Sequence, residues 1–267
     1  MNAMSGRNTV LQPYDSTYDP LVAKSPGRGL DYAPSYWVAS AGAPPEDDGP
    51  ITGDCDVDVV VVGGGSTGMS TAMYLAEDHG IKAVVLEANQ TAWGCSSRSG
   101  GQGQNASGRL SRSQWIERWG MDTAKRLDTE IRRGFDNFKQ LTKDIECEAF
   151  DGGHLYMAHK PAKMAYLRNM AQVRNDYFGY QTKILSAEEV RERYCDEREH
   201  FGAMLEEEGV GVHPLKLTFG IMRKARAMGV KVHPASPVQG LTTVNGIHHI
   251  QTPGGVVRAK RVVFCTG

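Results

Sequence analysis

Several features that mark other classes of protein are missing from this sequence of 267 residues. No stretch approaches the length of apolar chain that a membrane-spanning helix needs, so no membrane partner is predicted. Charge of one sign is not in excess either, since 30 Lys and Arg oppose 31 Asp and Glu. Binding to a nucleic-acid backbone needs a clustered basic surface, so this balance argues against a nucleic-acid binder. No basic and then apolar signal segment opens the chain, and a cytoplasmic location is predicted.

Cysteine is scarce and does not occur at a spacing typical of metal sites. The five cysteines form an odd number, and no two of them lie at C-x-x-C spacing. The adjacent His248 and His249 would point to opposite faces of a strand, which is poor geometry for a shared metal ion. The sequence therefore predicts reduced cysteines, no disulfide framework and no metal site.

Proline is concentrated in residues 1–52, which hold seven of the chain's 12 prolines and show no periodicity. This composition predicts a Pro-rich N-terminal arm rather than a folded domain. Tyr32, Tyr36 and Trp37 can bury large areas, so we expect a portion of the arm to contact the body of the protein.

A strand–helix–strand unit follows the arm. Val57–Val62 is an almost uninterrupted run of valines, typical of a buried strand. A glycine-rich loop comes next, and apolar residues at helical spacing then predict a helix that ends near His79. Ala83–Leu86 is a second buried strand, and Glu87 stands at its end.

The loop itself reads Gly63-x-Gly65-x-x-Gly68, which is typical of a dinucleotide-binding fold when a strand precedes it and a helix follows. Gly63 would allow the tight turn, Gly65 the approach of a pyrophosphate, and Gly68 close packing of the helix on the strand. The helix N-terminus offers free N–H groups to phosphates. Glu87 can accept hydrogen bonds from ribose hydroxyls and disfavours a 2′-phosphate, so NADP is not expected. The alternative is a glycine turn without a ligand.

The rest of the chain is predicted to mix helices and strands. A helical pattern covers residues 112–144, with Gly120 dividing it in two, and Pro161 and Pro214 each open a further helix. A capping box at Ser186 predicts a short helix. The predicted strands are 154–158, 230–232, a three-stranded meander over 238–258, and Arg261–Cys265. Residues 88–109 are predicted to be a long loop.

A second motif lies in that loop, at Trp93-Gly94-Cys95-Ser96-Ser97-Arg98-Ser99-Gly100-Gly101-Gln102. Small residues here would let the backbone lie against a planar ring, and Arg98 could pair with a phosphate or steady an electron-rich ring. A flexible serine-glycine loop is the alternative.

Together these motifs resemble the D-amino-acid-oxidase-like family of FAD-dependent amine oxidoreductases, and within it the gamma-glutamylputrescine oxidases. That subgroup has a Ser-Tyr-aromatic segment like Ser35-Tyr36-Trp37 ahead of its first strand. It also has a loop like residues 92–102, from which this sequence departs at Cys95, Ser97 and Ser99. These departures bear on the substrate more than on the flavin.

The resemblance implies an α/β protein with an α+β substrate region: a Rossmann-like FAD-binding domain in two segments, with an inserted substrate domain. The implied boundaries are an arm at 1–52, the first FAD-binding segment at 53–110, a partial substrate or cap domain at 111–199, and the second, truncated FAD-binding segment at 200–267. Val238 matches a backbone contact to adenine in the family, and Thr266-Gly267 match its strand end beside FAD. The expected cofactor contacts are Gly63, Gly65, Ser66, Thr67, Gly68, Glu87, Ala88, Ser96, Ser97, Arg98, Gly100, Gly101, Gln102, Val238, Thr266 and Gly267.

The family's domain continues well past the Thr266-Gly267 motif at which this sequence stops. The resemblance therefore implies that the chain is an N-terminal portion of a longer enzyme, whose C-terminal portion is absent. A fragment of this kind would leave a strand end and helix-packing faces uncovered, which predicts poor solubility.

The reaction implied is oxidation of a carbon beside an amine nitrogen, to an imine that water hydrolyses. A gamma-glutamylated polyamine is the first candidate substrate, in polyamine catabolism, and a D-amino acid, glycine or sarcosine is the second. Oxygen or another acceptor would take the electrons. No catalytic base is predicted, because a neutral amine needs none, and His213 and Tyr156 are expected to be structural. A non-catalytic FAD-binding fragment and an NAD-linked dehydrogenase are the alternatives, and the sequence leaves the oligomeric state open.

Overall fold

The computed structural model describes residues 31–106 and 108–266. Gly267, predicted as a cofactor contact, and residues 1–30 of the predicted arm lie outside the described residues. The chain forms two compact units: unit 1 comprises the residues up to Ser97 together with those from Ile221 on, and unit 2 is Arg98–Gly220. The sequence instead predicted boundaries near residues 110 and 199, and that functional division stays a prediction.

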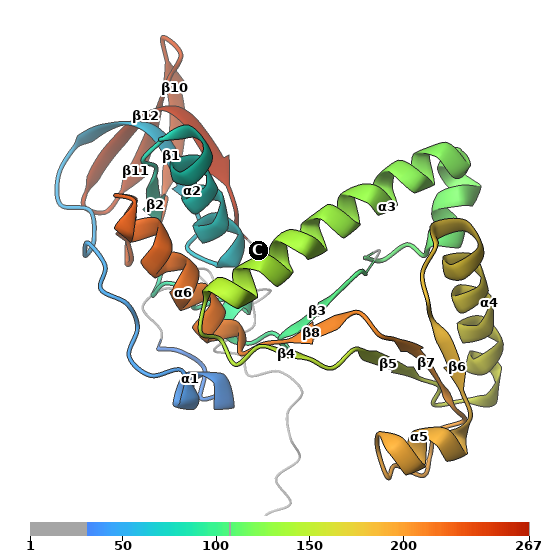
Figure 1. Cartoon of the computed structure of the whole chain (residues 1–267). Helices are drawn as coiled ribbons and strands as arrows, with labels where there is room; N and C mark the ends of the chain where they lie inside the picture. The colour runs from blue at the N-terminus through green and yellow to red at the C-terminus, as the bar shows by residue number, and fades with distance from the viewer. Residues whose placement is uncertain (1–30, 107, 267) are drawn as a thin grey trace, which may run out of the picture. The chain divides into compact units, whose positions relative to one another are not determined.

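Unit 1 is built on a six-stranded sheet in the order β10-β11-β12-β1-β2-β9. Neighbours among β12, β1, β2 and β9 pair in parallel, and β10, β11 and β12 form an antiparallel meander. Their bounds are Cys55–Val62 for β1, Val84–Leu86 for β2, Lys231–His233 for β9, Gly240–Val244 for β10, Ile247–Thr252 for β11 and Gly255–Phe264 for β12. Helix α2, Ser66–His79, lies beside β1 and β2 (Figure 1). Its end is set by Gly80, which adopts the left-handed conformation that glycine adopts without strain.

The core of unit 1 explains the valine run of the first strand. Val60 and Val61 in β1 are fully buried, and they pair with Val84 and Val85 of β2. Ile250 of β11 is also fully buried. A strand that is covered on both faces needs apolar residues without alternation, so the predicted buried strand is confirmed.

The C-terminal strands differ from the sequence prediction in one respect. The predicted meander over 238–258 and the separate strand Arg261–Cys265 share one continuous strand, β12, which runs from Gly255 to Phe264. The reason is the neighbour on the other side, since β1 pairs with β12 in one constant register from Val257 to Phe264. The predicted turn at Asn245-Gly246 is confirmed, because both residues have positive φ (52° and 79°), as a tight hairpin requires.

The described portion of the arm contacts unit 1 at several points. The Tyr32 hydroxyl donates to the carbonyl of Thr91 at 2.5 Å, as expected for an aromatic residue that packs on the body. Tyr36 differs from that expectation, because it lies in the short helix α1, Tyr36–Ser40, with 69% of its surface exposed. Its ring lies edge-on to Trp37.

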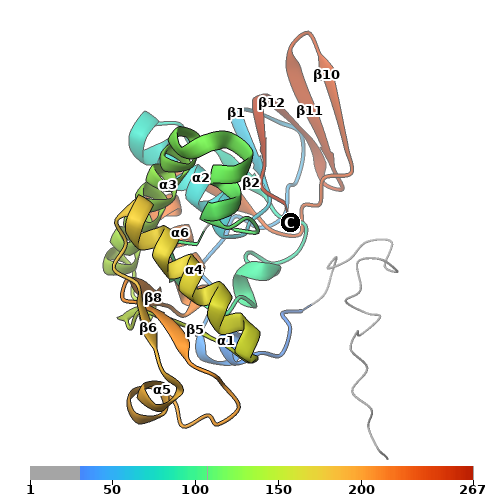
Figure 2. The same ribbon diagram turned by 90° about the vertical axis from the view of Figure 1, so that its right-hand side faces the viewer.

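Unit 2 contains two three-stranded sheets, in the orders β3-β8-β4 and β5-β7-β6. Helix α4 packs on β6 and β7 of the second sheet (Figure 2). The strands are β3 Gln102–Gln104, β4 Phe150–Asp151, β5 His154–Met157, β6 Lys183–Leu185, β7 Ala203–Glu206 and β8 Gly209–Gly211. The helices that begin in unit 2 are α3 Arg112–Asp144, α4 Pro161–Phe178, α5 Ala187–Arg193 and α6 Pro214–Ala227, which continues into unit 1.

The local signals for the helices of unit 2 are confirmed. Ser186 forms the predicted capping box at the start of α5, and Ser111 forms another, which was not predicted, at the start of α3. Gly120 interrupts α3 with φ 79° and ψ 165°, so it divides the helix as predicted. Within the described residues of the chain, no helix has the length and apolar character needed to cross a bilayer.

Candidate functional site

The glycine loop at the end of β1 has the backbone geometry predicted for Gly63 and Gly68. Gly63 has φ +112°, and a side chain there would place Cβ 2.7 Å from the carbonyl oxygen of Cys265. At Gly68 a Cβ would lie 1.9 Å from the carbonyl oxygen of Gly63. Gly63 therefore makes the tight turn and Gly68 lets α2 approach the strand, as the motif requires.

The N-terminus of α2 is left partly open by this loop. The Ser66 amide donates to the Ser96 side-chain oxygen at 2.8 Å, and the two serine hydroxyls are 2.9 Å apart. Over residues 31–106 and 108–266, no acceptor lies on the backbone N–H groups of Thr67 or Gly68. Two adjacent N–H donors at the positive end of a helix dipole suit a phosphate, so the donor set fits the pyrophosphate of a dinucleotide.

Glu87 holds the loop from the end of β2. Its Oε2 accepts the Gly64 amide at 2.7 Å, and its Oε1 accepts the Asn89 amide at 2.9 Å. A carboxylate has about four acceptor positions, so capacity remains for the ribose contact predicted from the sequence. The following residue, Ala88, is exposed.

The other predicted contacts in unit 1 differ in what their side chains do. Thr266 is exposed, and its amide nitrogen lies 3.3 Å from the position of a Cβ built on Gly63. Val238 is half-buried and packs on the core of the sheet. Ser97 is fully buried, and its hydroxyl donates to the carbonyls of Trp93 and Gly94, so its side chain braces its own turn. A cofactor contact by Ser97 stays a prediction.

The remaining predicted contacts belong to unit 2. Arg98 and Gly100 are exposed. Gly101 has φ +68°, and a Cβ there would lie 2.0 Å from the carbonyl oxygen of Val212. Gln102 begins β3, so the long loop expected over residues 88–109 contains a short strand and, at Cys95–Ser97, a 3₁₀ turn. The close approach of the Val212 carbonyl requires glycine at position 101, and a cofactor contact by Gly101 stays a prediction.

The two side chains considered as catalytic candidates have local structural partners. His213 is 1% exposed, and its Nδ1 accepts the Lys216 amide at 3.2 Å, so it caps α6. Burial lowers the pKa of His213, which favours the neutral ring that this capping bond needs. The Tyr156 hydroxyl donates to Gln104 Oε1 at 2.6 Å, and burial raises the pKa of this tyrosine.

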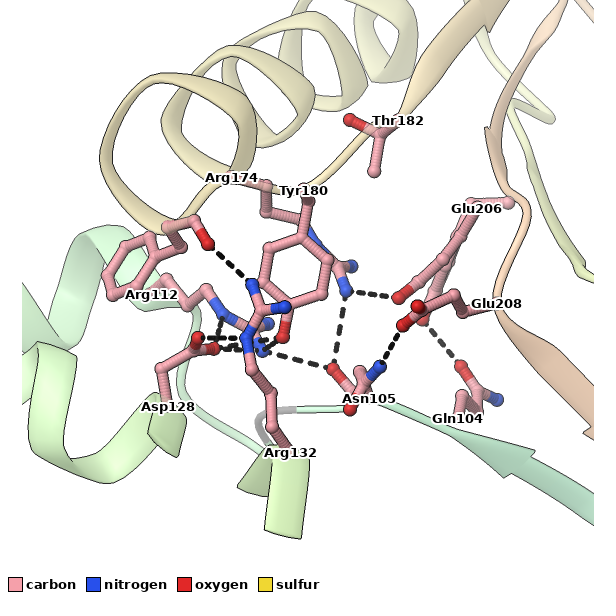
Figure 3. A network of polar contacts seen from close by, with 12 residues as sticks. Gln104, Asn105, Arg112, Asp128, Arg132, Arg174, Tyr180, Thr182, Glu206 and Glu208 are labelled. Atoms are coloured by element: carbon pink, nitrogen blue, oxygen red, sulfur yellow. Dashed lines mark hydrogen bonds and ion pairs between the residues drawn. The ribbon is translucent and has the colours of Figure 1, made fainter. Parts of the chain in front are cut away.

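A buried network of charged side chains in unit 2 was not predicted from the sequence (Figure 3). Arg112 from α3 donates through Nε to Asp128 at 2.6 Å, and Arg174 from α4 donates to Glu206 at 2.5 Å. Both arginines also donate to the backbone oxygen of Asn105, which follows β3. The network therefore ties two helices and two strands of unit 2 together.

Burial affects the ionisation of the acidic side chain Glu206 in this network. The side chains of Arg174 and Glu206 are 3% and 2% exposed, and Glu206 Oε2 has no hydrogen-bond partner among the described residues. Burial raises the pKa of Glu206, against the opposing effect of Arg174. No cluster of His, Cys, Asp and Glu suited to a metal ion occurs in the described ranges, 31–106 and 108–266.

Residues 58–267 match the family model described as FAD dependent oxidoreductase. The chain is 33% identical over 241 residues to gamma-glutamylputrescine oxidoreductase of Escherichia coli (strain K12), a match that covers 87% of this chain and 54% of the relative. It is 27% identical over 219 residues to a probable oxidoreductase OrdL of Haemophilus influenzae (strain ATCC 51907 / DSM 11121 / KW20 / Rd), which covers 81% of this chain and 50% of that protein. The chain spans about half the length of the curated relatives it matches.

Solved structures agree with this fold. Glycine oxidase from Geobacillus kaustophilus superposes with a TM-score of 0.65 at 20% identity, over 79% of this chain and 55% of that one. An L-amino acid deaminase from Proteus vulgaris superposes with a TM-score of 0.64 at 23% identity, over 83% of this chain and 50% of that one. At these identities the likeness concerns the fold alone.

Proposed function

Because the chain belongs to the family of FAD-dependent oxidoreductases, we propose that it acts in the oxidation of a small amine at the carbon beside the nitrogen. Membership confirms the family resemblance seen in the sequence and FAD as the cofactor, and the solved structures confirm the Rossmann-like α/β fold. The observation that carries the proposal is the loop Gly63–Gly68, which closes a tight turn against Cys265 and presents the open N-terminus of α2.

The residues of unit 1 have distinct roles in this proposal. The N–H groups of Thr67 and Gly68 would hold the pyrophosphate, and Ser96 keeps the first turn of α2 in place by accepting the Ser66 amide. Glu87 would accept a ribose hydroxyl while it holds the Gly64 amide. FAD supplies, when bound, the acceptor for a hydride equivalent from the substrate carbon.

The steps after the hydride transfer need few groups from the protein. Loss of a hydride equivalent from the carbon and a proton from the nitrogen leaves an imine, which water hydrolyses to an aldehyde or keto acid and an amine or ammonia. An amine that binds in its neutral form needs no protein base, and we nominate none. His213 is engaged as a helix cap, which agrees with that choice.

A gamma-glutamylated polyamine is the substrate class we favour. The support is the 33% identity to a gamma-glutamylputrescine oxidoreductase over most of this chain. A role in polyamine catabolism, a cytoplasmic location, and oxygen or another compound as electron acceptor stay predictions. D-amino acids, glycine and sarcosine form the comparison set for the test below.

The test is a visible absorption spectrum of the purified chain after incubation with FAD, before and after anaerobic addition of an amine panel. We expect a bound flavin band that gamma-glutamylputrescine bleaches and glycine, sarcosine and D-alanine do not. Bleaching by one of the amino acids instead would overturn the substrate class. A stable flavin band that no amine bleaches would indicate a non-catalytic FAD-binding fragment.

A matched pair of glycine variants tests the site itself. Gly65→Ala adds a methyl group 3.0 Å from Ser96 Oγ at the start of α2, whereas Gly94→Ala in the neighbouring loop meets nothing within 4 Å. We expect Gly65→Ala to weaken FAD binding at least tenfold and Gly94→Ala to leave it within about twofold. Equal affinities would remove the glycine loop from the proposal. Binding of NAD in the absence of flavin would favour a nicotinamide-linked dehydrogenase.

A further inference from the structure

Unit 2 contains a cavity of about 580 Å³ that none of the predicted cofactor contacts lines. Its walls are the first turn of α3, one side of α4 and the ring of Tyr156 in β5. Small-molecule sites have volumes of about 300–1,000 Å³, so the cavity is large enough for a ligand of metabolite size.

The charged side chains that line the cavity are all cationic. They are Arg109, Arg112, Lys163 and Arg174, and no Asp or Glu is among the lining residues. Like charges in one space repel each other, and a negative ligand would offset that repulsion. The set therefore predicts a negative ligand.

Two of these cations are fixed and two are not. Arg112 and Arg174 are buried, and Asp128 and Glu206, which lie behind them and do not line the cavity, hold them in place. Arg109 and Lys163 are exposed, and neither has an ion-pair partner within the described ranges. The cavity therefore has two uncompensated positive charges at its opening and two oriented guanidinium groups deeper in.

Neutral hydrogen-bond donors complete the lining. Ser111, Ser113 and Asn169 border the cavity, and the first two lie at the N-terminus of α3, where the helix dipole adds partial positive charge. The Ser111 hydroxyl oxygen accepts the backbone N–H of Gln114, so this side chain already has a partner within the protein. The dipole and the four cations act on the same space.

We propose that this cavity binds a small organic anion through one or two carboxylate groups. A dicarboxylate carries two negative charges, as many as the cavity has cations without an ion-pair partner in the described ranges, and guanidinium groups bind carboxylates in a bidentate manner. The carboxylate belongs either to the amine substrate, as in a glutamyl group, or to a separate organic acid. The cavity lies wholly within unit 2, so binding does not depend on the proposed oxidation.

Isothermal titration of the full chain with glutarate tests the proposal, with the uncharged diamide of the same length and inorganic phosphate as comparison ligands. We expect glutarate to bind, and raising the salt from about 0.05 M to about 0.5 M to weaken it several-fold because exposed charges are screened. Absence of glutarate binding, equal binding of the diamide, or tighter binding of phosphate would each overturn the carboxylate site.

Because Arg109 and Lys163 are exposed, neutralising them is expected to change the stability of the fold little. Lys163→Gln and Arg109→Gln should each weaken glutarate binding by about fivefold or more. Arg168→Gln is the matched control, because Arg168 is an exposed cation of α4 that does not line the cavity, and it should leave binding within about twofold. An equal loss in all three variants would show a general charge effect and overturn the site.

A competition experiment separates the two sources of the carboxylate. If gamma-glutamylputrescine displaces glutarate, the cavity holds the carboxylate of that amine. If both bind at once, the cavity serves a separate organic acid. Both results support the site, and neither requires that the amine is oxidised, so the two proposals fail independently.

Discussion

Removal of Arg174 is expected to destabilise unit 2 strongly, because it leaves Glu206 buried without its partner. The two side chains are 3% and 2% exposed and form an ion pair at 2.5 Å. Glu206 Oε2 has no hydrogen-bond partner among the described residues. Arg174 is the main cation that offsets the Glu206 charge, with a smaller contribution from Arg112. Arg174→Met keeps the volume and the apolar stem of the side chain but removes the charge.

The size of the effect follows from the cost of a buried uncompensated carboxylate. Truncation of one partner in such a pair costs about 3–5 kcal/mol. A matched control is Arg133→Met, because Arg133 pairs with Glu130 on the surface, where the side chains are 73% and 68% exposed. We expect that control to change the unfolding free energy by less than about 1 kcal/mol.

The penalty should also depend on pH, with a sign set by Glu206. Burial raises the pKa of Glu206 in the folded protein above the ordinary value, and Arg174 opposes that rise. Without Arg174 the pKa rises further, so the neutral form is favoured in the folded state. The stability is then fully present below the ordinary glutamate pKa and is lost as the pH rises through the folded value. The cost of Arg174→Met should therefore be smallest near about pH 4.5 and largest near about pH 8.

Urea unfolding at the two pH values, followed by circular dichroism, measures this difference. The double variant with Glu206→Leu should recover most of the stability at the higher pH, because removal of both charges leaves none unpaired. A cost of Arg174→Met below about 1 kcal/mol at the higher pH, or no difference between the two pH values, would refute the reasoning. Failure of the double variant to recover would mean that packing, not charge, is what Arg174 supplies.

Three smaller effects follow from single contacts. Gly68→Ala should cost about 1–3 kcal/mol of unfolding free energy and abolish FAD absorbance, since its Cβ would lie 1.9 Å from the Gly63 carbonyl oxygen; retention of flavin by the purified variant would contradict this. Tyr32→Phe removes the hydroxyl that donates to Thr91, and thermal melts should show a loss of about 1 kcal/mol. That loss should be fully present below pH 10.0, the ordinary tyrosine pKa, and should shrink as the pH rises above it, because burial raises the pKa of Tyr32 in the folded protein to about 12. Ser186→Ala removes the capping box of α5 and should cost about 1 kcal/mol by urea unfolding, an unchanged midpoint being the contrary result.

The glycine loop and the strand before it could be predicted from the sequence because their requirements are local. A buried parallel strand must be apolar along its whole length, and Val57–Val62 nearly is. The turn that follows needs glycine at Gly63 and Gly68 for reasons that involve backbone atoms within a few residues, and at Gly63 also Cys265. Such signals do not depend on knowing the rest of the fold.

The short strands of unit 2 could not be predicted, because their extended conformation depends on residues that are distant in the sequence. Strand β3 is Gln-Gly-Gln and β8 is Gly-Val-Gly, and both contain glycine, which is depleted in strands. A Cβ at Gly103 would lie 2.1 Å from the ring of Phe138, and one at Gly211 would lie 2.1 Å from the ring of Phe150. Both glycines are there to admit an aromatic ring from a distant segment, which no local pattern reveals.

The buried ion pair of unit 2 could be predicted from the sequence only in part. Glu206 ends the strand Ala-Met-Leu-Glu, all four residues of which are buried, so an acid in an apolar strand is a signal that sequence reading could use. The identity of its cationic partner could not be predicted. Arg174 lies 32 residues earlier in a helix with exposed lysines and arginines, and the chain offers 30 cations in all. A sequence can thus indicate that a carboxylate needs a cation, while only the packing of α4 on β7 selects which one.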